Sequence, residues 1–481
     1  MATITMKFGG TSVGSAQAIA QVAEIIHRAY QENHRLLVVS SAMSGVTDML
    51  IEGARSAMAG DASRYPALAH ELRTKHETAI RTLLKSDVER IAIHDEVDAL
   101  IDEFETLCYG IYVLRESSPK AMDKVSSLGE RMCVPIISAL LRQRGVPSTT
   151  ISASHLIVTD DQYQNAGVLF AETEYTVRQE LLPLLGQGII PVITGFMGAT
   201  RDGVITTLGR GGSDYSAAIL GAYVDSDEVW IWTDVDGVMT ADPRAVPDAR
   251  VIPVLSYGEV GEMAYFGAKV LHSKTVQPLV ERNIPIRVKN TFNPSAEGTL
   301  IVNREEATPG TVKAVTAIRD VSMITVTGRG MIGIPGIAAR TFSAVAKQGA
   351  NILMISQSSS EQSICFVVPQ TKSTEVVRAI QRELETEFGR QDIDRAWANN
   401  DVEIVTVVGA GMLTQSGVAA RVFGALGDGD INILAIAQGA SDYCVSMVVG
   451  TDATQAAVRQ IHELVVLNGY AADLPLAAKH T

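Results

Sequence analysis

The chain has 481 residues, 46% of them hydrophobic and 20% charged, which favours two or three globular units rather than one. Its formal net charge of −14 argues against nucleic acid or an anionic membrane surface as a partner. No apolar run approaches the roughly 20 residues that a membrane-spanning helix requires.

The chain starts directly with a predicted strand, Ile4–Phe8, so no signal or transit peptide is expected. The four cysteines are far apart in the sequence and form no CxxC pair: Cys108, Cys133, Cys365 and Cys444. This pattern argues against a disulfide framework or a metal site, and it favours a reduced cytoplasmic setting.

The first part of the chain alternates β-rich runs with helical stretches, which predicts an α/β domain with a mostly parallel sheet over 1–302. Buried strands are expected at 36–40, 189–193 and 228–232. Apolar residues recur at helical spacing at about 48–124, so a helical insertion is predicted there.

A polar stretch at 303–314 is predicted to be a linker, and the sequence beyond it contains an internal repeat. Equivalent residues lie 81 positions apart, as in the pairs Gly328 and Gly409, Asn351 and Asn432, and Gln357 and Gln438. Two copies of a small α+β module are therefore predicted, at 315–396 and 397–481. A strand at 311–319 is expected to pair with the second copy.

The segment Met6–Ser12 predicts a strand that runs into a Gly-Gly turn. Gly9 and Gly10 permit positive φ and close approach of the backbone, so that consecutive N–H groups can converge on a phosphate, and Lys7 adds a point charge. The lysine precedes the glycines, so this is not a Walker A loop. Taken alone, the segment is more often a purely structural turn.

A second glycine-rich stretch, Thr207–Ser216, leads into a predicted helix whose N-terminus favours a bound anion. Arg210 can hold a carboxylate through two parallel hydrogen bonds. Asp214 either takes part in this chemistry or is an ordinary carboxylate of a first helical turn, and the segment alone does not decide between the two.

A third element, Thr233–Gly237, follows a buried strand at its carboxyl end, where open α/β sheets place their ligands, and Asp-Pro-Arg follows at 242–244. A turn that is merely acidic is the alternative. Lys269 interrupts an apolar helical stretch at 266–272, where a lysine that reaches out to the surface is the alternative.

Together the motifs occur in the order KFGGTSV, SAMSGVTD, SLGERM, TLGRGGSDYSA, TDVDGV with DPR, and FGAKVLH. This order resembles the aspartate kinases of the amino acid kinase family over essentially the whole chain, and the repeat resembles their pair of ACT modules. The resemblance implies an αβα sandwich with a mostly parallel sheet, followed by two ferredoxin-like α+β ACT modules. It also implies ATP-dependent phosphorylation of the β-carboxylate of L-aspartate, the first step toward lysine, threonine and methionine.

By the same resemblance, single residues have implied roles. The catalytic residues are implied to be Lys7, Arg210 and Asp214. The aspartate-binding residues are implied to be Ser41, Gly45, Thr47, Glu130, Arg210 and Ser213. The ATP-binding residues are implied to be Lys7, Gly9, Gly10, Ser12, Thr233, Asp234, Arg244 and Lys269. Arg210 would meet the α-carboxylate of aspartate and Glu130 its α-ammonium.

The acceptor of this reaction is a carboxylate that is already ionised at pH 7, so no strong general base is needed. Catalysis then depends on holding two anions in line and on neutralising the charge of the phosphoryl oxygens. Mg²⁺ is expected to be held mainly by the phosphates of ATP, and no permanent metal site of the protein is expected.

ACT modules of this family bind free amino acids where two modules meet. The effector-binding residues are implied to be Met331, Asn351, Gln357, Asn432 and Gln438. Lysine-responsive relatives tend to carry an acidic residue in the strand where this chain has Leu353 or Met354, so threonine is expected as the inhibitor and lysine is the alternative. Glutamines that only bridge strands are a further alternative. A homodimer or homotetramer through the ACT modules is expected.

Two rival functions remain open at this point. One is another kinase of the superfamily, acting on glutamate, N-acetylglutamate, carbamate or UMP, against which SAMSGVTD, Glu130 and the ACT pair argue. The other is a catalytically inactive amino-acid sensor, which would be expected to lack Lys7, Arg210 or Asp214. A fused homoserine dehydrogenase is not expected, because the sequence ends soon after the second copy.

Overall fold

The computed structural model describes residues 1–32, 34–267, 271, 273–303, 312–358, 362–412, 414–438 and 442–468. These residues form two compact units. The first unit is drawn from Met1–Val238, Pro253–Tyr257 and Leu271–Arg304, and the second from Met239–Ile252, Gly258–Val270 and Glu305–Thr481. Two segments within the predicted first domain therefore group with the second unit. The domain boundaries themselves stay a prediction.

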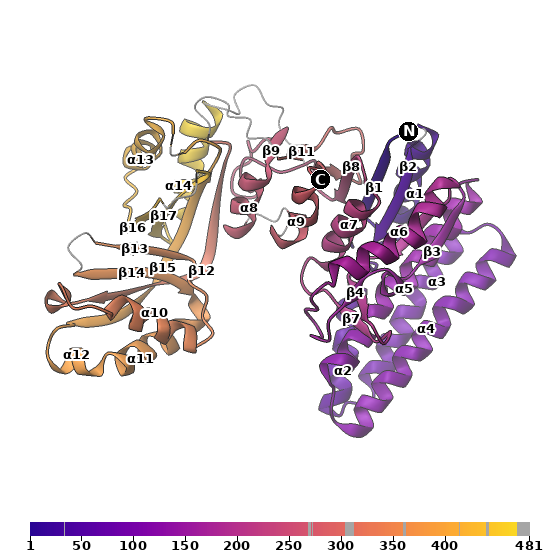
Figure 1. Ribbon diagram of the computed structural model, residues 1–481, viewed down its shortest axis with the longest axis horizontal. Helices are drawn as coiled ribbons and strands as arrows, with labels where there is room; N and C mark the ends of the chain where they lie inside the picture. The colour runs from indigo at the N-terminus through magenta and orange to yellow at the C-terminus, as the bar shows by residue number, and fades with distance from the viewer. Residues whose placement is uncertain are drawn as a thin grey trace. The chain divides into compact units, whose positions relative to one another are not determined.

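The first unit contains an eight-stranded sheet with the order β3-β5-β2-β1-β8-β10-β11-β9 (Figure 1). Its strands are β1 (Thr3–Phe8), β2 (Arg35–Ser40), β3 (Ser148–Ile151), β5 (Ile190–Thr194), β8 (Glu228–Thr233), β9 (Val254–Ser256), β10 (Ile286–Asn290) and β11 (Thr299–Val302). Every neighbouring pair is parallel except β10 and β11. The predicted mostly parallel sheet is thus confirmed, and β2, β5 and β8 are three of the predicted buried strands. A small second sheet joins β4 (Val158–Thr159), β6 (Met197–Thr200) and β7 (Ile205–Thr207).

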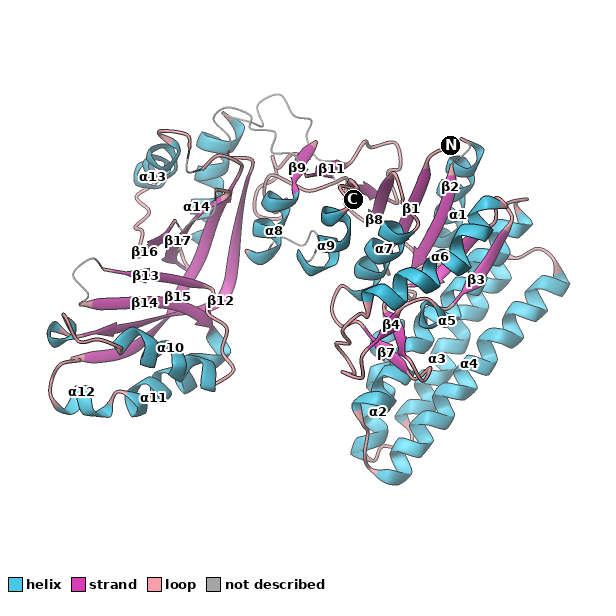
Figure 2. Cartoon of the chain, in the orientation of Figure 1, coloured by secondary structure: helices cyan, strands magenta, loops and turns pink. Residues whose placement is uncertain are grey.

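Helices cover both faces of the large sheet, which makes the first unit an αβα sandwich (Figure 2). The helices are α1 (Ala16–Gln31), α2 (Val46–Ala59), α3 (Arg64–Leu83), α4 (Asp87–Leu114), α5 (Pro119–Gln143), α6 (Phe170–Gly186), α7 (Gly212–Tyr223) and α9 (Ser273–Glu281). Helix α8 (Tyr257–Tyr265) belongs to the second unit from Gly258 onward. Leu37 and Val39 of β2 face α6 and α7, while Leu36 and Val38 face the core that α1 to α5 cover. Successive side chains of a strand point to opposite faces, so a strand that is apolar throughout needs cover on both sides.

The predicted helical insertion is confirmed as the consecutive helices α2 to α5, and the helical run extends to Gln143. The predicted far end fell inside α5, which is buried on nearly all sides between Val125 and Leu141. This burial brings Glu130, in the middle of α5, close to the sheet.

The second unit contains one antiparallel sheet with the order β13-β14-β12-β15-β17-β16. The first copy of the repeat consists of β12 (Ala314–Thr327), α10 (Ile337–Lys347), β13 (Met354–Gln357), β14 (Ser363–Pro369), α11 (Ser373–Glu383) and α12 (Glu385–Gly389). The second copy consists of β15 (Arg395–Val408), α13 (Val418–Asp428), β16 (Ala435–Ala437), β17 (Cys444–Gly450) and α14 (Thr454–Ile461). The predicted repeat of two α+β modules is confirmed, since β12 and β15 begin 81 residues apart.

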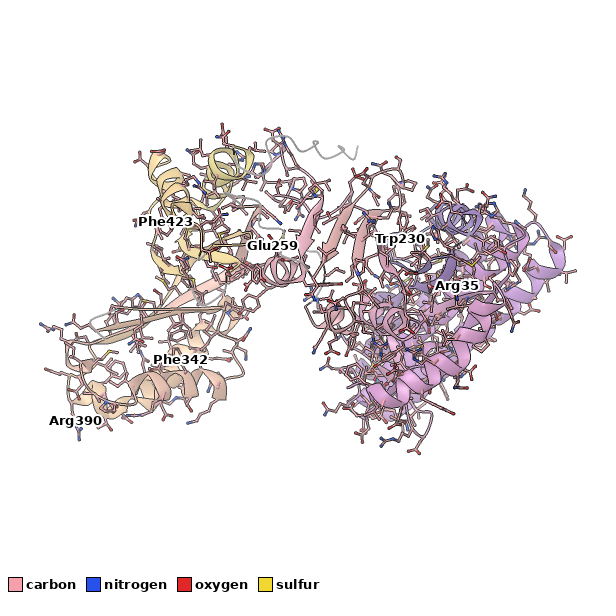
Figure 3. All side chains as sticks on the ribbon, turned by 45° about the horizontal axis from the view of Figure 1, so that its top comes forward. Arg35, Trp230, Glu259, Phe342, Arg390 and Phe423 are labelled. Atoms are coloured by element: carbon pink, nitrogen blue, oxygen red, sulfur yellow. The ribbon has the colours of Figure 1, made fainter. Side chains whose placement is uncertain are left out.

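The two copies also bury equivalent side chains. The first core contains Val326, Val345, Phe366, Val376 and Ile380, and the second contains Val407, Leu426, Met447, Ala457 and Ile461. Phe342 and Phe423, which Figure 3 labels, occupy equivalent positions and pack against these two cores. The long strands are shared between the copies, because Ala314–Ile318 of β12 pairs with Ile404–Val408 of β15. No helix in the described part of the chain is long and apolar enough to cross a membrane.

Candidate active site

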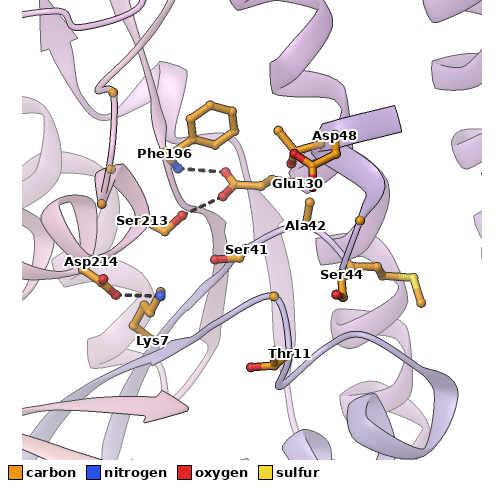
Figure 4. Close-up of a pocket in the computed structure, with 17 residues that line it drawn as sticks. Lys7, Thr11, Ser41, Ala42, Ser44, Asp48, Glu130, Phe196, Ser213 and Asp214 are labelled. Atoms are coloured by element: carbon orange, nitrogen blue, oxygen red, sulfur yellow. Dashed lines mark hydrogen bonds and ion pairs between the residues drawn. The ribbon is translucent and has the colours of Figure 1, made fainter. Parts of the chain in front are cut away.

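A cavity of about 480 Å³ lies in the first unit, at the carboxyl ends of β1 and β2 (Figure 4). This volume is in the range of small-molecule sites, and parallel sheets place their ligands at this edge. Eight of the predicted site residues line it: Lys7, Gly10, Ser41, Gly45, Thr47, Glu130, Ser213 and Asp214. Four motifs that are far apart in the sequence therefore meet at one cavity.

The N-termini of two helices border this cavity. Gly45 precedes α2 and Gly211 precedes α7, and both glycines have a left-handed backbone, with φ of 79° and 74°. Neither helix has a side-chain cap, and the N–H groups of Thr47 and Ser213 have no acceptor among the described residues. Unpaired N–H groups and the positive end of the helix dipole both favour an anionic ligand at this place.

Lys7 and Asp214 form an ion pair inside the cavity. The distance from Lys7 Nζ to Asp214 Oδ1 is 2.6 Å, and the side chains are 11% and 22% exposed. Lys7 is the residue before the last of β1, and Asp214 lies in the first turn of α7. The ammonium group is thus held beside two helix N-termini, where it adds to the positive potential that an anion would meet.

Glu130 is the most deeply buried carboxylate of the cavity, with 1% of its surface exposed. Its Oε1 accepts a hydrogen bond from Ser213 Oγ at 2.9 Å, and its Oε2 accepts one from the Phe196 N–H at 2.8 Å. Burial raises the pKa of the Glu130 carboxyl to about 7, although these two hydrogen bonds and the charge of Lys7 oppose the rise. Each oxygen has room for a second donor, so the carboxyl can also receive an ammonium group.

The Gly-Gly turn after β1 differs from the prediction. Neither Gly9 nor Gly10 has a positive φ, and the Gly9 N–H donates to the Trp232 carbonyl at 3.2 Å, which removes it from any phosphate cradle. A Cβ atom at Gly10 would lie 3.3 Å from the Ala42 carbonyl oxygen. Glycine at this position therefore relieves a close backbone approach and is not there for a left-handed conformation.

Ser12 is completely buried and is occupied by structural contacts. Its hydroxyl donates to the Trp232 carbonyl at 3.2 Å and accepts from Thr291 Oγ1 at 2.7 Å. These bonds fix the turn after β1 against β8 and the loop that follows β10. The structure thus gives Ser12 a supporting position behind the cavity rather than a place in its lining.

Other predicted residues lie outside the cavity lining. Arg210 is exposed and, among the described residues, makes no ion pair or hydrogen bond. Thr233 donates to Asp234 at 3.1 Å at the carboxyl end of β8. Arg244 belongs to the second unit and is paired with Asp242 at 2.7 Å. Lys269 lies outside the described residues, so its predicted role stays a prediction.

Sequence reasoning missed several residues that line the cavity, namely Thr11, Ser44, Asp48, Phe196, Gly209 and Gly211. Most of them adjoin predicted residues in the same motifs. Phe196 had a usable signal, because it follows the predicted strand 189–193 at its carboxyl end, where ligands bind. Its backbone N–H is the group that holds Glu130.

A separate cavity of about 320 Å³ lies in the first copy of the repeat, beside the N-terminus of α10. Among the predicted effector residues, Met331 and Gln357 line it, and Asn351 does not. Met331 is buried and Gln357 is exposed at the end of β13. In the second copy, Asn432 and Gln438 are exposed.

Comparison with known families decides what kind of protein this is. The family model described as the amino acid kinase family matches residues 2–290, and the model of an ACT domain matches 324–384 and 405–464. The chain belongs to the amino acid kinase family. Within this family its relatives are aspartokinases, as the motifs and the repeat predicted.

Three relatives illustrate this similarity. Aspartokinase 3, chloroplastic, from Arabidopsis thaliana is 32% identical over 467 residues, which cover 96% of this chain and 81% of that protein. The bifunctional aspartokinase/homoserine dehydrogenase 1 of Zea mays is 36% identical over 462 residues. A crystal structure of E. coli aspartokinase III with aspartate and ADP has a TM-score of 0.78 and 30% identity, and the match covers 96% of this chain and 99% of that one. The chain spans about half the length of the first curated relatives it matches.

Proposed function

We propose that this aspartokinase-family chain transfers the γ-phosphoryl group of ATP to the β-carboxylate of L-aspartate, giving 4-phospho-L-aspartate. The observation that carries the proposal is the single cavity in which the Lys7–Asp214 ion pair, Glu130 and the N-termini of α2 and α7 meet. The solved E. coli relative was crystallised with aspartate and ADP, which are the acceptor substrate and the nucleotide product of the proposed reaction.

In this proposal the aspartate ammonium group binds Glu130, and the Lys7 ammonium group faces the transferring phosphoryl group. Two anions have to approach each other, so the helix N-termini and Lys7 offset their repulsion. Asp214 keeps Lys7 in position through the 2.6 Å ion pair. The acceptor carboxylate needs no base, because it is ionised at neutral pH.

Arg210 keeps its proposed role at the α-carboxylate of aspartate, because Gly209 and Gly211 on either side of it line the cavity. Its guanidinium group is free among the described residues to fold toward a bound anion. Arg210→Lys should chiefly raise the KM for aspartate, since lysine keeps the charge and loses the two-pronged hydrogen bond. A change in the KM for ATP alone would assign Arg210 to the nucleotide.

Mg²⁺ is proposed to enter with the nucleotide. Asp48 and Asp214 offer carboxylate oxygens at the cavity, the ligand type that Mg²⁺ prefers, but Asp214 is already paired with Lys7. Such a donor set suits an ion held mostly by phosphates, and the ion would neutralise charge on the phosphoryl oxygens. Thr233, Asp234, Arg244 and Lys269 remain the proposed contacts of the nucleotide.

The effector proposed for the ACT modules is threonine, bound in the cavity of the first copy. The N–H groups of Ile337 and Ala338 at the start of α10 have no acceptor among the described residues and suit a carboxylate, while the Gln357 amide suits the other polar groups of a small amino acid. Lysine is the second candidate, because the E. coli relative was also solved with lysine and aspartate.

The proposed assembly is a homodimer or homotetramer through the ACT modules. Both edge strands of the antiparallel sheet expose an isoleucine at equivalent positions, Ile355 (47% exposed) on β13 and Ile436 (40% exposed) on β16. Exposed edge strands of this kind are usually paired or covered. The proposed setting is the cytoplasm, since none of the four cysteines forms a disulfide.

The test of the proposed function is ADP release in the presence of ATP and Mg²⁺ with aspartate, glutamate, N-acetylglutamate, carbamate or UMP as acceptor. Aspartate alone should support rapid release, and Lys7→Ala should lower kcat by about 100-fold or more. The aspartate kcat/KM should rise as pH increases through about 7, where Glu130 becomes ionised, and this limb should be absent in Glu130→Gln. Equal activity of folded Lys7→Ala and wild type would refute the assignment.

A further inference from the structure

The first unit contains a second cavity, of about 380 Å³, that plays no part in the proposed reaction. It is bordered by one face of α4, one face of α5 and the carboxyl ends of β3 and β5. From α4 come Glu96, Ala99, Leu100 and Glu103. From α5 come Arg131, Val134 and Pro135. In both helices the spacing of three and four residues puts these side chains on a single face.

Three charged side chains line this cavity, namely Glu96, Glu103 and Arg131, and Glu96 and Arg131 do not pair with each other. Glu96 makes no ion pair or hydrogen bond among the described residues, and Arg131 donates to Glu103 at 3.2 Å instead. Glu103 also forms an ion pair with Lys124, with 2.7 Å between Lys124 Nζ and Glu103 Oε1. Two positive charges thus face the single negative charge of Glu103. Glu96 is exposed at the rim of the cavity; partial desolvation raises the pKa of its carboxyl, and the charges of Arg142 and Arg131 oppose this rise. The cavity therefore has one free carboxylate and one guanidinium with capacity for a further acceptor.

The remaining lining supplies hydrogen-bonding groups and an apolar floor. Pro135 lies inside α5 and has no N–H, so the ordinary helical hydrogen bond to the Arg131 carbonyl is absent at the cavity. The hydroxyl groups come from Thr150, Ser152 and Thr194, and the apolar side chains from Leu100, Val134 and Ile151. An apolar pocket with a few polar groups that fix orientation is the usual construction of a small-ligand site.

We propose that this second cavity binds a small α-amino acid with an apolar side chain. Its ammonium group pairs with Glu96 and its carboxylate with Arg131. Its side chain lies on Leu100 and Val134. A charged side chain would have no counterpart there, because Glu103 is already balanced by Lys124 and Arg131. The ligand thus differs in chemistry from aspartate, which carries a second carboxylate.

The second cavity adjoins the candidate active site through α5 and the turn after β5. Arg131 directly follows Glu130, and Thr194 lies two residues before Phe196, whose N–H holds the Glu130 carboxyl. A ligand on Arg131 and Thr194 therefore acts on the two segments that position Glu130. We expect its binding to change the KM for aspartate.

The test is calorimetric titration of the full-length chain with L-valine, L-leucine and L-methionine. Three variants accompany the wild type. Ala99→Trp fills the cavity from an exposed position of α4, and Glu96→Gln removes the proposed partner of the ammonium group. Ala92→Trp is the matched control, because Ala92 is exposed on the same helix and does not line the cavity.

At least one of the three amino acids should bind wild type and Ala92→Trp alike, and about tenfold more weakly to Ala99→Trp and Glu96→Gln. The same amino acid should shift the aspartate KM at least about twofold in wild type and leave it unchanged in Ala99→Trp. Absence of binding to wild type, or equal binding to Ala99→Trp, would overturn the proposal. Binding that Gln357→Ala abolishes and Ala99→Trp leaves intact would assign the ligand to the ACT modules and would also overturn it.

Discussion

The two copies of the ACT repeat share a fold but differ in what packs against them. The core of the first copy is drawn only from residues 324–396. The core of the second copy also takes in Ala241, Val246 and Ala249, from the segment 239–252 that lies outside the repeat. The second copy is therefore built into its surroundings in a way that the first is not.

A buried ion pair adds to this division. Lys313, just before β12, pairs at 3.0 Å with Glu259 of α8, and both side chains are almost completely buried at 2% and 0% exposure. The backbone N–H of Lys313 donates a hydrogen bond to the Val408 carbonyl of the second copy. The first copy has its own cavity beside Gln357 instead. The two copies thus differ: the second is anchored by segment 239–252, and the first has the cavity in which an effector is proposed to bind.

The largest expected effect concerns the anchoring contact. Glu259→Ala should destabilise the protein by about 3–5 kcal/mol, because it removes the carboxylate that pairs with the buried charge of Lys313. Urea unfolding followed by circular dichroism measures this loss. The matched change in the first copy is Lys347→Ala, which breaks a solvent-exposed pair with Glu383 and should cost at most about 1 kcal/mol.

A double variant separates the ion pair from simple loss of packing. Replacement of both partners, in Glu259→Met with Lys313→Met, should recover much of the stability, since no charge is then left buried. Equal destabilisation by Glu259→Ala and Lys347→Ala would contradict the distinction between an anchored and a free copy.

The next effect is a dependence of stability on pH that only the second copy should have. Buried His462 contacts Thr240 Oγ1 at 2.8 Å, and burial lowers the pKa of His462 to about 4, with Asp248 and Arg250 as the nearby charges. The folded state thus favours neutral histidine. The stability that neutral His462 contributes is fully present above pH 6.5 and is lost as the pH falls toward 4. The loss at pH 5, relative to neutral pH, is about 2 kcal/mol.

The first copy provides its own control for this prediction, because the position equivalent to His462 is Gln381. His462→Gln should therefore flatten the fall in stability between pH 7.5 and pH 5 relative to wild type, as measured by urea midpoints at each pH. Burial also lowers the pKa of His76 to about 4. Because His76 is present in both proteins, its effect cancels when the two pH profiles are compared. Parallel pH profiles for wild type and His462→Gln would exclude a role for this histidine.

The third prediction compares the two glutamines. Gln357→Ala should raise the threonine concentration for half-inhibition by about tenfold or more, since it removes a polar group from the lining of the cavity in the first copy of the repeat. Gln438→Ala should have a clearly smaller effect. Activity without threonine should stay normal in both variants, and calorimetry should show the same order. A larger effect of Gln438→Ala would reverse the roles of the copies, and inhibition by lysine alone would identify the other effector.

Sequence reasoning recovered the parts of the fold that repeat or alternate. The parallel strands were visible because their apolar runs are bounded by turns, and the repeat was visible because 81 residues separate each pair. The contact of segment 239–252 with the second copy was not predicted. The spacing of Ala241, Val246 and Ala249 in the sequence does not indicate which distant segment they pack against. Long-range packing of this kind is decided by tertiary structure.

The candidate site was recovered in the same uneven way. Residues at strand and helix ends were found because chain topology fixes their place, as with Lys7, Glu130 and Asp214. The contacts of Ser12 were not predicted, because nothing in a glycine-rich turn indicates that its serine hydroxyl meets Trp232 and Thr291. The second cavity was missed because Glu96 and Arg131 come from helices whose pairing the sequence does not encode locally.

The smallest expected effect concerns the link between α8 and the first copy. The Tyr265 hydroxyl donates to the carbonyls of Ile352 and Leu353 at 3.3 and 3.4 Å, and the tyrosine is 48% exposed. A long, solvent-exposed hydrogen bond contributes at most about 0.5–1 kcal/mol, so Tyr265→Phe should hardly change the urea midpoint. It contrasts with the buried Glu259–Lys313 pair on the same helix.

Regulation should be more sensitive to Tyr265 than stability is, because Ile352 and Leu353 directly precede β13, the strand that ends at Gln357. A free energy of this size corresponds to about a two- to fivefold change in a binding equilibrium. Tyr265→Phe should therefore raise the threonine concentration for half-inhibition by about that factor and leave the uninhibited rate unchanged. Titration of activity with threonine at fixed aspartate and ATP measures the shift. If Tyr265→Phe and wild type gave the same curve while Gln357→Ala did not, the first copy would bind threonine but pass its signal through contacts other than Tyr265.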